Sequence, residues 1–487
     1  MKCPFANLTG AEGGMAPPSG ASEPRNGSSS LPGEPGVTTD RRPPFIADDE
    51  ATRWLFSLNR FGFRPGLRRI EGLLGELDHP ERQVPTLVVA GTNGKGSTTR
   101  ILAALLQNAG YRVGCFTSPH LLRVHERLTI DDKPVERQLF ANAIARVRPA
   151  VEKHAASWFE TLTALALDIS QREGVEILCC EAGLGGRLDA TNALPALATL
   201  LVSVAVDHRQ VLGDTLAEIA AEKLGLLKQG VPLFCAVDEA LRPQVFAAAV
   251  AAGSPCHFLD ELARWEDCAD SWRLVTRRGV LGDLPRPASA VLQRNMALAL
   301  LCLEELAARG AVRAVTDPAA ALHGLFLPGR FQLILTAPDW LVDTAHNTAA
   351  LCTALDTFLA RPLSGRRYVL FGCMEDKEID SAVGDRLRSC DGVVATPIDL
   401  PRSRNLNGLT ELLNAWGLEQ SAAVSVAPDL HSALARLVRV LEPTDQVLLT
   451  GSCFLVADFL YRLGFRDLDE TRRPRPAPDV LARIRWS

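Results

Sequence analysis

Three features are missing from this sequence, and each absence excludes a class of protein. No run of about 18 apolar residues occurs, so we expect no transmembrane helix. The net charge is −5 with no basic block, so a nucleic-acid partner is not indicated. The first residues lack a basic segment followed by an apolar one, so we expect no secretory signal.

The cysteines of this chain lack the C-x-x-C spacing that is typical of metal-binding and redox-active sites. Twelve cysteines are scattered along the chain, none of them in a C-x-x-C pair, and Cys179 and Cys180 lie inside an apolar run. This pattern is typical of reduced thiols in a hydrophobic core. We therefore expect a cytoplasmic protein. We also expect small-molecule partners only, no membrane contact and a monomeric state.

Composition divides the chain into a tail and two globular regions. Residues 1–45 are rich in Gly, Pro, Ser and Glu with little apolar periodicity, which predicts a disordered tail. The rest of the 487 residues is long enough for at least two ordinary domains. A turn-rich stretch around Gly324 and Gly329 indicates a hinge, so we predict domains at 46–326 and 327–487.

Apolar strands alternate with helical segments in both regions, which predicts an α/β fold with mostly parallel sheets. We expect a P-loop ATPase-like sheet flanked by helices in the N-terminal region and a smaller, Rossmann-like domain in the C-terminal region. The predicted strands are 86–90, 112–117, 175–180, 197–206, 231–237, 331–335, 340–342, 368–372, 392–395 and 446–450. The predicted helices are 67–77, 136–147, 159–172, 215–228, 347–360, 379–389, 409–416 and 429–440.

A glycine-rich phosphate loop follows the first of these strands, because residues 86–98 read TLVVAGTNGKGST. Backbone N–H groups, the dipole of the following helix and the ammonium of Lys95 together attract a phosphate. The loop departs from the common G-x-x-x-x-G-K-[ST] pattern, since Val89 replaces the first glycine and Gly96 separates Lys95 from Ser97. The segment predicts a site for a small nucleotide.

Charged side chains follow two further predicted strands. Glu181 comes directly after 175–180, at the edge where an open parallel sheet binds ligands, and could hold Mg²⁺ on a nucleotide. Asp207 and His208 follow 197–206 at the same edge, where the imidazole could ligate Mg²⁺ or a water molecule. Lys223 allows two interpretations: a solvated surface lysine, or a desolvated one that CO₂ converts into a metal-ligating carbamate.

The C-terminal region offers a second set of candidates. Arg330 follows a Pro-Gly turn, where it could clamp a phosphate. Asp343 and His346 follow strand 340–342, and Asp343 could accept a ribose hydroxyl. Lys377 follows strand 368–372. Because all of these groups come after strands, we expect them to face one rim.

Taken in order, these motifs resemble the folylpolyglutamate synthase/dihydrofolate synthase family, the folate branch of the Mur ligase superfamily. The resemblance covers residues 52–465, and Gly96 together with the Ser-Pro-His-Leu segment at 118–121 favours the folate branch over the cell-wall enzymes. The motifs that carry it are 91–97, 118–121, 126–127, 159–160, 181–192, 207–208, 212–213, 222–223, 328–330, 343–347 and 376–377.

The resemblance implies an ATP-dependent ligase that adds L-glutamate to dihydropteroate and to the γ-carboxylate of reduced folates through an acyl phosphate. It implies a Mur ligase-type central domain for ATP and folate at 46–326, a glutamate ligase domain at 327–487, two Mg²⁺ ions and a carbamylated Lys223. The implied catalytic residues are Lys95, His208 and Lys223; the ATP-binding residues are Gly94, Lys95, Gly96, Ser97, Asn295, Arg330 and Asp343; the metal ligands are Ser118, Glu181, His208 and Lys223; and the folate-binding residues are Phe159, Asp189 and Ala190.

Two segments depart from the family pattern, and three alternatives remain. After Gly451 and Ser452, the family often has an aromatic residue and then His or Tyr, and the residues before Asn295 lack a common His-Gln pair. The alternatives are a monofunctional folylpolyglutamate synthase, another Mur-type amino-acid ligase and a non-catalytic ATP-binding module. The joint presence of Lys95, Glu181, His208 and Lys223 argues against the last.

Overall fold

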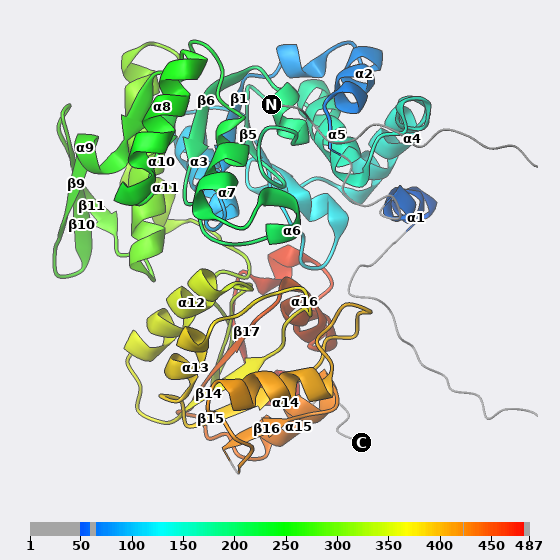
Figure 1. Ribbon diagram of the computed structural model, residues 1–487, viewed down its shortest axis with the longest axis vertical. Helices are drawn as coiled ribbons and strands as arrows, with labels where there is room; N and C mark the ends of the chain where they lie inside the picture. Colours follow the sequence, from blue (N-terminus) through cyan, green and yellow to red (C-terminus); the bar gives the residue numbers. More distant parts are fainter. Residues whose placement is uncertain (1–48, 59–64, 422, 482–487) are drawn as a thin grey trace, which may run out of the picture. The chain divides into compact units, whose positions relative to one another are not determined.

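The computed structural model describes residues 49–58, 65–421 and 423–481, so the predicted tail at 1–45 lies outside the described residues. Two large, mostly parallel sheets and one small antiparallel sheet occur in the described part (Figure 1). The prediction of an α/β fold is confirmed. No helix in these ranges combines the length and the hydropathy needed to cross a bilayer.

The first large sheet has the strand order β4-β3-β2-β5-β1-β6-β7-β8. Strands β2, β5, β1, β6, β7 and β8 run parallel, and β3 and β4 extend one edge in antiparallel fashion. The strands are β1 Thr86–Ala90, β2 Val113–Phe116, β3 Leu128–Ile130, β4 Lys133–Pro134, β5 Ile177–Glu181, β6 Ala196–Leu201, β7 Leu233–Cys235 and β8 Cys256–Phe258. The helices of this region are α1 Glu50–Ser57, α2 Arg68–Glu76, α3 Lys95–Asn108, α4 Arg137–His154, α5 Trp158–Arg172, α6 Arg209–Leu212, α7 Leu216–Leu224, α8 Arg242–Ala252, α9 Leu259–Leu262, α10 Ala290–Ala308 and α11 Pro318–His323.

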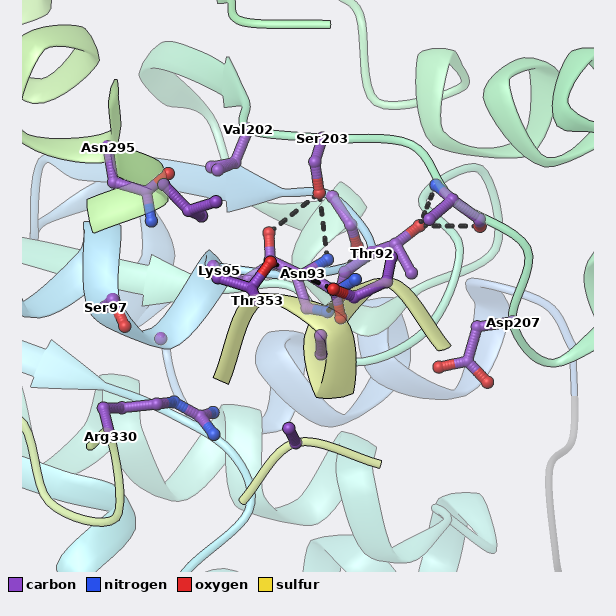
Figure 2. A pocket seen from close by; sticks show the side chains of 18 of the residues that line it. Thr92, Asn93, Lys95, Ser97, Val202, Ser203, Asp207, Asn295, Arg330 and Thr353 are labelled. Atoms are coloured by element: carbon purple, nitrogen blue, oxygen red, sulfur yellow. Dashed lines mark hydrogen bonds between the residues drawn. The ribbon is translucent and has the colours of Figure 1, made fainter. Parts of the chain in front are cut away.

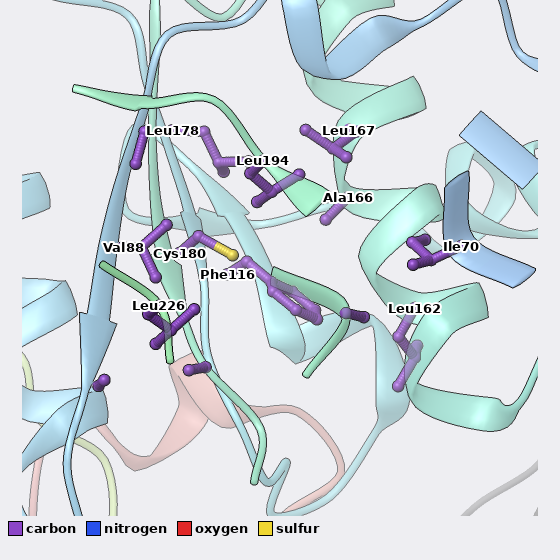
Figure 3. Packing of buried hydrophobic residues seen from close by; sticks show 14 of the residues in the cluster. Ile70, Val88, Phe116, Leu162, Ala166, Leu167, Leu178, Cys180, Leu194 and Leu226 are labelled. Carbon is purple, nitrogen blue, oxygen red and sulfur yellow. The ribbon is translucent and has the colours of Figure 1, made fainter. Parts of the chain in front are cut away.

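Both faces of this sheet are buried, which explains the continuous apolar runs of its strands. Along β1, Leu87 and Val89 join a hydrophobic cluster with α3 and α10, whereas Val88 and Ala90 join the cluster on the other face with α4 and α5. Figure 3 shows this second cluster, with Val88 close to Cys180 of β5. The two-residue alternation therefore fixes the register of β1 between two helical layers.

The second large sheet has the order β16-β15-β14-β17-β13-β12-β18, and only the β12–β13 pair is antiparallel. Its strands are β12 Gln332–Thr336, β13 Asp339–Val342, β14 Arg367–Phe371, β15 Gly392–Ala395, β16 Val424–Val426, β17 Gln446–Thr450 and β18 Arg475–Pro476. Its helices are α12 Thr348–Ala360, α13 Ser381–Leu387, α14 Leu406–Ala415, α15 Leu430–Val438, α16 Cys453–Arg462 and α17 Ala477–Leu481.

A loop between β2 and β3 joins the cores of the two large sheets. Leu121 and Leu122 belong to the same hydrophobic cluster as Trp340 of β13. The buried carboxylate of Glu126 accepts hydrogen bonds from the backbone N–H groups of Leu121 at 3.1 Å, Leu122 at 3.2 Å and Arg123 at 2.8 Å. Glu126 thus holds the loop in the shape that delivers both leucines to the second core.

Strand β6 was predicted to reach residue 206, but it ends at Leu201. Beyond that point Ser203 turns to the phosphate loop: its carbonyl accepts from the N–H of Thr92 at 2.9 Å, and its hydroxyl accepts from the N–H of Asn93 at 3.0 Å. The backbone that would have continued the strand supports the loop instead. The small sheet of β9 Ala263–Asp267, β10 Ser271–Thr276 and β11 Val280–Pro285 was not predicted.

Candidate functional site

A cavity of about 540 Å³ lies at the carboxyl ends of β1, β5 and β13, so residues of both large sheets line it (Figure 2). This agrees with the prediction that groups after separate strands face one rim. The cavity is lined by every residue predicted for ATP, metal or catalysis: Gly94, Lys95, Gly96, Ser97, Ser118, Glu181, His208, Lys223, Asn295, Arg330 and Asp343.

The phosphate loop connects β1 to α3 and leaves no room for a side chain at position 94. Gly94 is the N-cap of α3 and has φ of +84°, a conformation that favours glycine. A Cβ atom at this position would lie 2.7 Å from the amide nitrogen of Asn295 on α10. The ammonium of Lys95 donates to the carbonyls of Gly91 at 3.1 Å and Thr92 at 3.0 Å, which holds it at the loop.

Replacing Gly94 with alanine is expected to weaken nucleotide binding at least about tenfold. The left-handed backbone costs an alanine about 1–2 kcal/mol, and the added methyl must also displace Asn295. The Kd for AMPPNP with Mg²⁺, measured by calorimetry, checks this. Gly110→Ala is the control, because Gly110 has φ of +80° but, apart from its chain neighbours, no atom of the described residues lies within 4 Å of the added Cβ. Equal affinity in the two variants would contradict a specific role for the Gly94–Asn295 approach.

Glu181 at the end of β5 places a buried carboxylate in the cavity. It is 4% exposed, and its Oε2 accepts from the N–H of Ser118 at 2.7 Å. A Cβ at Gly96 would lie 3.1 Å from Oε2, so glycine keeps this approach open. Burial raises the pKa of Glu181, while Lys95 and the Ser118 N–H oppose the shift.

The donor set fits Mg²⁺ on a nucleotide better than a preformed metal cage. Among the described residues no three His, Cys, Asp or Glu side chains converge as metal ligands. Glu181 and the hydroxyls of Ser97 and Ser118 line the same cavity as Lys95. Such a sparse oxygen set suits Mg²⁺, which keeps water molecules and phosphate oxygens in its coordination shell.

His208 reaches the cavity from the segment after β6, not from the strand end as predicted. It has φ of +53° and precedes the short helix α6. Burial, aided by the charge of Lys377, lowers the pKa of His208 to about 4 despite the opposing charge of Asp207. The imidazole is therefore neutral near pH 7 and keeps a lone pair for a metal ion.

Lys223 of α7 is a buried lysine, so its interpretation as a solvated surface residue is wrong. It is 4% exposed, and its ammonium donates to the carbonyl of Gly91 at 3.0 Å. Burial and the nearby charge of Lys95 lower the pKa of Lys223 to about 7. A large fraction of this amine is thus unprotonated at neutral pH and able to react with an electrophile.

Asp343 and Arg330 bring the second sheet to the cavity. The carboxylate of Asp343 accepts from the N–H groups of Phe331 and Ala345, both at 2.8 Å. The Thr344 N–H also donates to the carbonyl of Gly329 at 2.9 Å, so the turn that carries Arg330 is held against the end of β13. Arg330 is thereby placed to meet an anion in the cavity.

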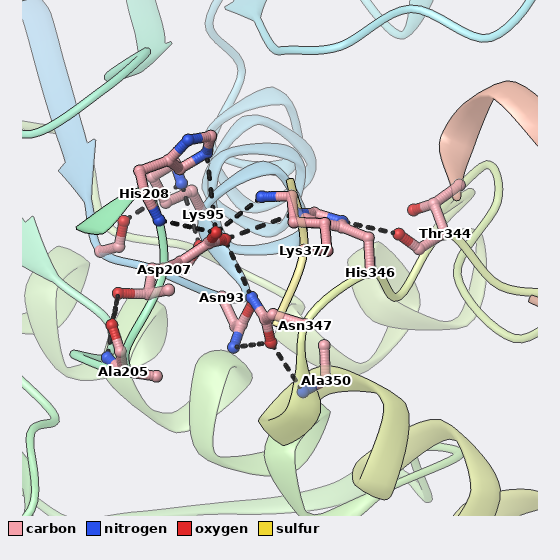
Figure 4. Close-up of polar contacts among 12 residues, drawn as sticks. Asn93, Lys95, Ala205, Asp207, His208, Thr344, His346, Asn347, Ala350 and Lys377 are labelled. Carbon is pink, nitrogen blue, oxygen red and sulfur yellow. Dashed lines mark hydrogen bonds and ion pairs between the residues drawn. The ribbon is translucent and has the colours of Figure 1, made fainter. Parts of the chain in front are cut away.

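A polar cluster at the edge of the cavity was predicted only in part (Figure 4): Asp207, His346 and Lys377 were expected at the rim, but their connection to Asn93 and Asn347 was not. Asp207 pairs with Lys377 at 2.6 Å and accepts from Asn347 at 3.1 Å, and Asn347 exchanges two hydrogen bonds with Asn93. Burial alone would raise the pKa of Asp207, but the neighbouring His346, His208 and Lys377 side chains hold it well below its usual range. Asn93 and Asn347 both occur in the motifs, but a pairing across 254 residues has no signal in a single sequence.

The three residues predicted for folate do not line the cavity. They lie behind the loop of residues 183–184, which does line it. A Cβ at Gly183 would lie 2.6 Å from the ring of Phe159, and Asp189 accepts from the N–H of Leu184 at 2.8 Å. Ala190 is buried beside Asp189.

Comparison with known proteins gives one family and consistent relatives. Residues 329–453 match the glutamate ligase domain of Mur ligases. The chain is 29% identical to the dihydrofolate synthase/folylpolyglutamate synthase of Bacillus subtilis over 86% of this chain and 100% of the relative. The Escherichia coli protein of the same name is 30% identical over 80% of this chain and 90% of the relative. The folylpolyglutamate synthase of Lacticaseibacillus casei is 30% identical over 84% of this chain and 96% of the relative.

Solved structures resemble the chain over almost their whole length. Escherichia coli FolC in complex with DHPP and ADP has a TM-score of 0.77 at 28% identity, covering 85% of this chain and 98% of that one. A bifunctional folylpolyglutamate synthase/dihydrofolate synthase with Mn, AMPPNP and L-glutamate bound has a TM-score of 0.76 at 28% identity, covering 86% and 99%.

Proposed function

This chain belongs to the dihydrofolate synthase/folylpolyglutamate synthase family, and we propose that it is the bifunctional form, an ATP-dependent ligase that adds L-glutamate to dihydropteroate and to the γ-carboxylate of reduced folates. The enzyme uses ATP and a divalent cation. The observation that carries the proposal is the convergence of Lys95, Glu181, Lys223 and Arg330 on one cavity.

The reaction has two steps that place separate demands on the cavity. A carboxylate oxygen of the folate substrate attacks the γ-phosphorus of ATP, which releases ADP and leaves an acyl phosphate. The nitrogen of glutamate then attacks the acyl carbon and loses a proton, and phosphate departs from the tetrahedral intermediate. Lys95 and the N–H groups at the start of α3 stabilise charge on the transferred phosphoryl group. The walls from both sheets exclude water that would hydrolyse the acyl phosphate.

The ligands of the metal ions and the modification of Lys223 belong to the proposal. When bound, a divalent cation neutralises charge on the phosphate oxygens. Ser118 and Glu181 would hold one Mg²⁺, and His208 with carbamylated Lys223 would hold a second. The carbamate forms when the neutral amine attacks CO₂ and loses a proton. The lowered pKa of Lys223 supports this step, because it leaves the amine unprotonated near neutral pH.

The remaining assignments are also proposals. Gly94, Gly96, Ser97, Asn295, Arg330 and Asp343 would bind ATP, and Phe159, Asp189 and Ala190 would border the pterin from behind the 183–184 loop. We place a central ATP- and folate-binding domain at 46–326 and a glutamate ligase domain at 327–487. The protein would act as a monomer in the cytoplasm, without a nucleic-acid or membrane partner.

We expect ADP release that requires ATP, L-glutamate and either dihydropteroate or tetrahydrofolate. A coupled ADP assay across dihydropteroate, tetrahydrofolate and its one-carbon forms checks this. Turnover of tetrahydrofolate but not dihydropteroate would identify a monofunctional folylpolyglutamate synthase, the activity named for the Lacticaseibacillus relative. Turnover of a UDP-sugar peptide with no response to folates would contradict the folate assignment.

A further inference from the structure

Asn347 uses every hydrogen-bonding position of its amide where the phosphate loop meets the second sheet (Figure 4). Its Oδ1 accepts from Asn93 Nδ2 at 3.2 Å and from the N–H of Ala350 at 3.0 Å. Its Nδ2 donates to Asn93 Oδ1 at 2.9 Å and to Asp207 Oδ2 at 3.1 Å. An amide has two donors and two lone pairs, so the capacity of this side chain, which is on a residue only 3% exposed, is filled.

The surroundings allow the Asn347 amide one orientation. The N–H of Ala350 requires an acceptor, and the carboxylate of Asp207 requires a donor. A flipped amide would set its NH₂ group against the Ala350 N–H and its oxygen against the carboxylate, leaving buried polar groups unpaired. The orientation of Asn93 follows from that of Asn347, because the two amides bond reciprocally.

On one side, Asn347 contacts Asn93, which belongs to the phosphate loop itself. Ser203 fixes the main chain of Asn93: its hydroxyl accepts from the Asn93 N–H at 3.0 Å and donates to the Asn93 carbonyl at 2.9 Å. Lys95 lies two residues further on. A change in the loop on nucleotide binding therefore reaches the Asn347 amide directly.

On the other side, Asn347 shares the Asp207 carboxylate with two basic groups of the second sheet. Lys377 lies 2.6 Å from Oδ1, and His346 Nε2 lies 3.6 Å from Oδ2. Lys377 and His346 follow β14 and β13, and basic side chains suit the carboxylates of an acidic amino acid. Asn347 thus contacts both the nucleotide loop and the carboxylate that orients these two groups.

We propose that Asn347 is a positioning residue that couples the phosphate loop to the basic groups Lys377 and His346, so that binding of nucleotide and use of glutamate depend on each other through its amide. This inference rests on the proposed function. Asn347 is also the N-cap of α12, whose first turn lines the cavity. The test must therefore separate the capping role from the coupling role.

Asn347→Ser makes that separation, because a serine still caps the helix but has no amide to reach Asn93 and Asp207. We expect its KM for L-glutamate to rise at least about tenfold, since a donor to a carboxylate is lost. Its Kd for AMPPNP with Mg²⁺ in the absence of glutamate should stay within about threefold. Asn405→Ser is the matched control: Asn405 caps α14 by accepting from the N–H of Gly408 at 2.9 Å, outside the cavity.

A double-mutant cycle of Asn93→Ala and Asn347→Ser tests the pair itself. The combined effect on KM for glutamate should be clearly smaller than the product of the single effects. The coupling would be overturned if the two single effects on KM simply multiplied in the double variant. It would also be overturned if Asn347→Ser behaved like Asn405→Ser. If Asn347→Ser fails to fold, Asn347→Asp is the second variant, because aspartate has the size of asparagine and can still cap α12. It should raise the KM for glutamate further, since its carboxylate would face that of Asp207. If the wild-type protein showed no glutamate-dependent ADP release, the proposed function itself would be wrong.

Discussion

Lys223→Ala is expected to lower ATP- and glutamate-dependent ADP release about a thousandfold while leaving the protein folded. The side chain is buried, its ammonium donates to the carbonyl of Gly91 at 3.0 Å, and among the described residues no carboxylate pairs with it to justify a buried cation. Its removal deletes the proposed metal-ligating carbamate beside the phosphate loop. Steady-state kinetics and thermal unfolding, measured side by side, separate a loss of activity from a loss of fold.

A second, partly buried lysine supplies the control for Lys223. Burial also lowers the pKa of Lys228, whose ammonium donates to the carbonyl of Asn192 at 2.7 Å, but Lys228 does not line the cavity. Lys228→Met should therefore change stability and leave the rate within about threefold of wild type. Full activity in Lys223→Ala, or an equal loss in both variants, would rule out the proposed role of Lys223.

The proposed carbamate should depend on pH in a direction set by the amine. Only the neutral amine attacks CO₂, so occupancy should rise as pH increases through the pKa of Lys223, about 7. Carbon-13 NMR after incubation with labelled bicarbonate should show a carbamate signal at pH 8 that weakens at pH 6. The signal should be missing in Lys223→Ala, and its survival there would place the modification on another residue.

Glu181→Gln is expected to weaken Mn²⁺ binding about a hundredfold and to slow turnover to a similar degree. Glutamine has the same shape and can still accept the 2.7 Å hydrogen bond from Ser118, so the loss reports the charge and not the packing. Electron paramagnetic resonance titration of Mn²⁺ in the presence of AMPPNP measures the affinity directly.

Glu176 offers a comparison at the opposite end of β5. It precedes β5, at the opposite end from Glu181, and its carboxylate accepts from the N–H of Arg112 at 2.7 Å. The Glu176 carboxylate also accepts from a backbone N–H but lies outside the cavity. Glu176→Gln therefore removes a similar charge, and Mn²⁺ affinity should not change. The metal assignment for Glu181 fails if both glutamine variants bind Mn²⁺ as the wild type does.

Much of the fold was predictable because buried parallel strands have continuous apolar sequences. The predicted ranges 392–395 and 446–450 are confirmed residue for residue as β15 and β17, each buried on both faces. The error at β6 has a physical cause: residues 202–206 are as apolar as a strand, but Ser203 pairs with the phosphate loop. Strands β9 and β11 were missed because their exposed, charged residues give a weak pattern.

The site was predictable where a residue's chemistry is local and not where it depends on packing. Lys95 and Glu181 follow strands, so their place at the rim could be read from the sequence. The burial of Lys223 could not, because a helical pattern does not reveal that the Gly91 carbonyl lies against its ammonium. The Asn93–Asn347 pair is still harder to predict from local sequence, because the two residues meet only when both large sheets have formed.

The loop that carries Leu121 and Leu122 has a consequence for dividing this enzyme into parts. These two side chains are encoded more than 200 positions before β13, yet they fill the hydrophobic interior that surrounds Trp340. A fragment cut at the predicted hinge between Gly324 and Gly329 would leave an unfilled cavity in the core of the C-terminal piece and would expose two leucines of the N-terminal piece to water. Proteolysis at that hinge should therefore yield a nicked but associated pair, in which each piece depends on the other for solubility.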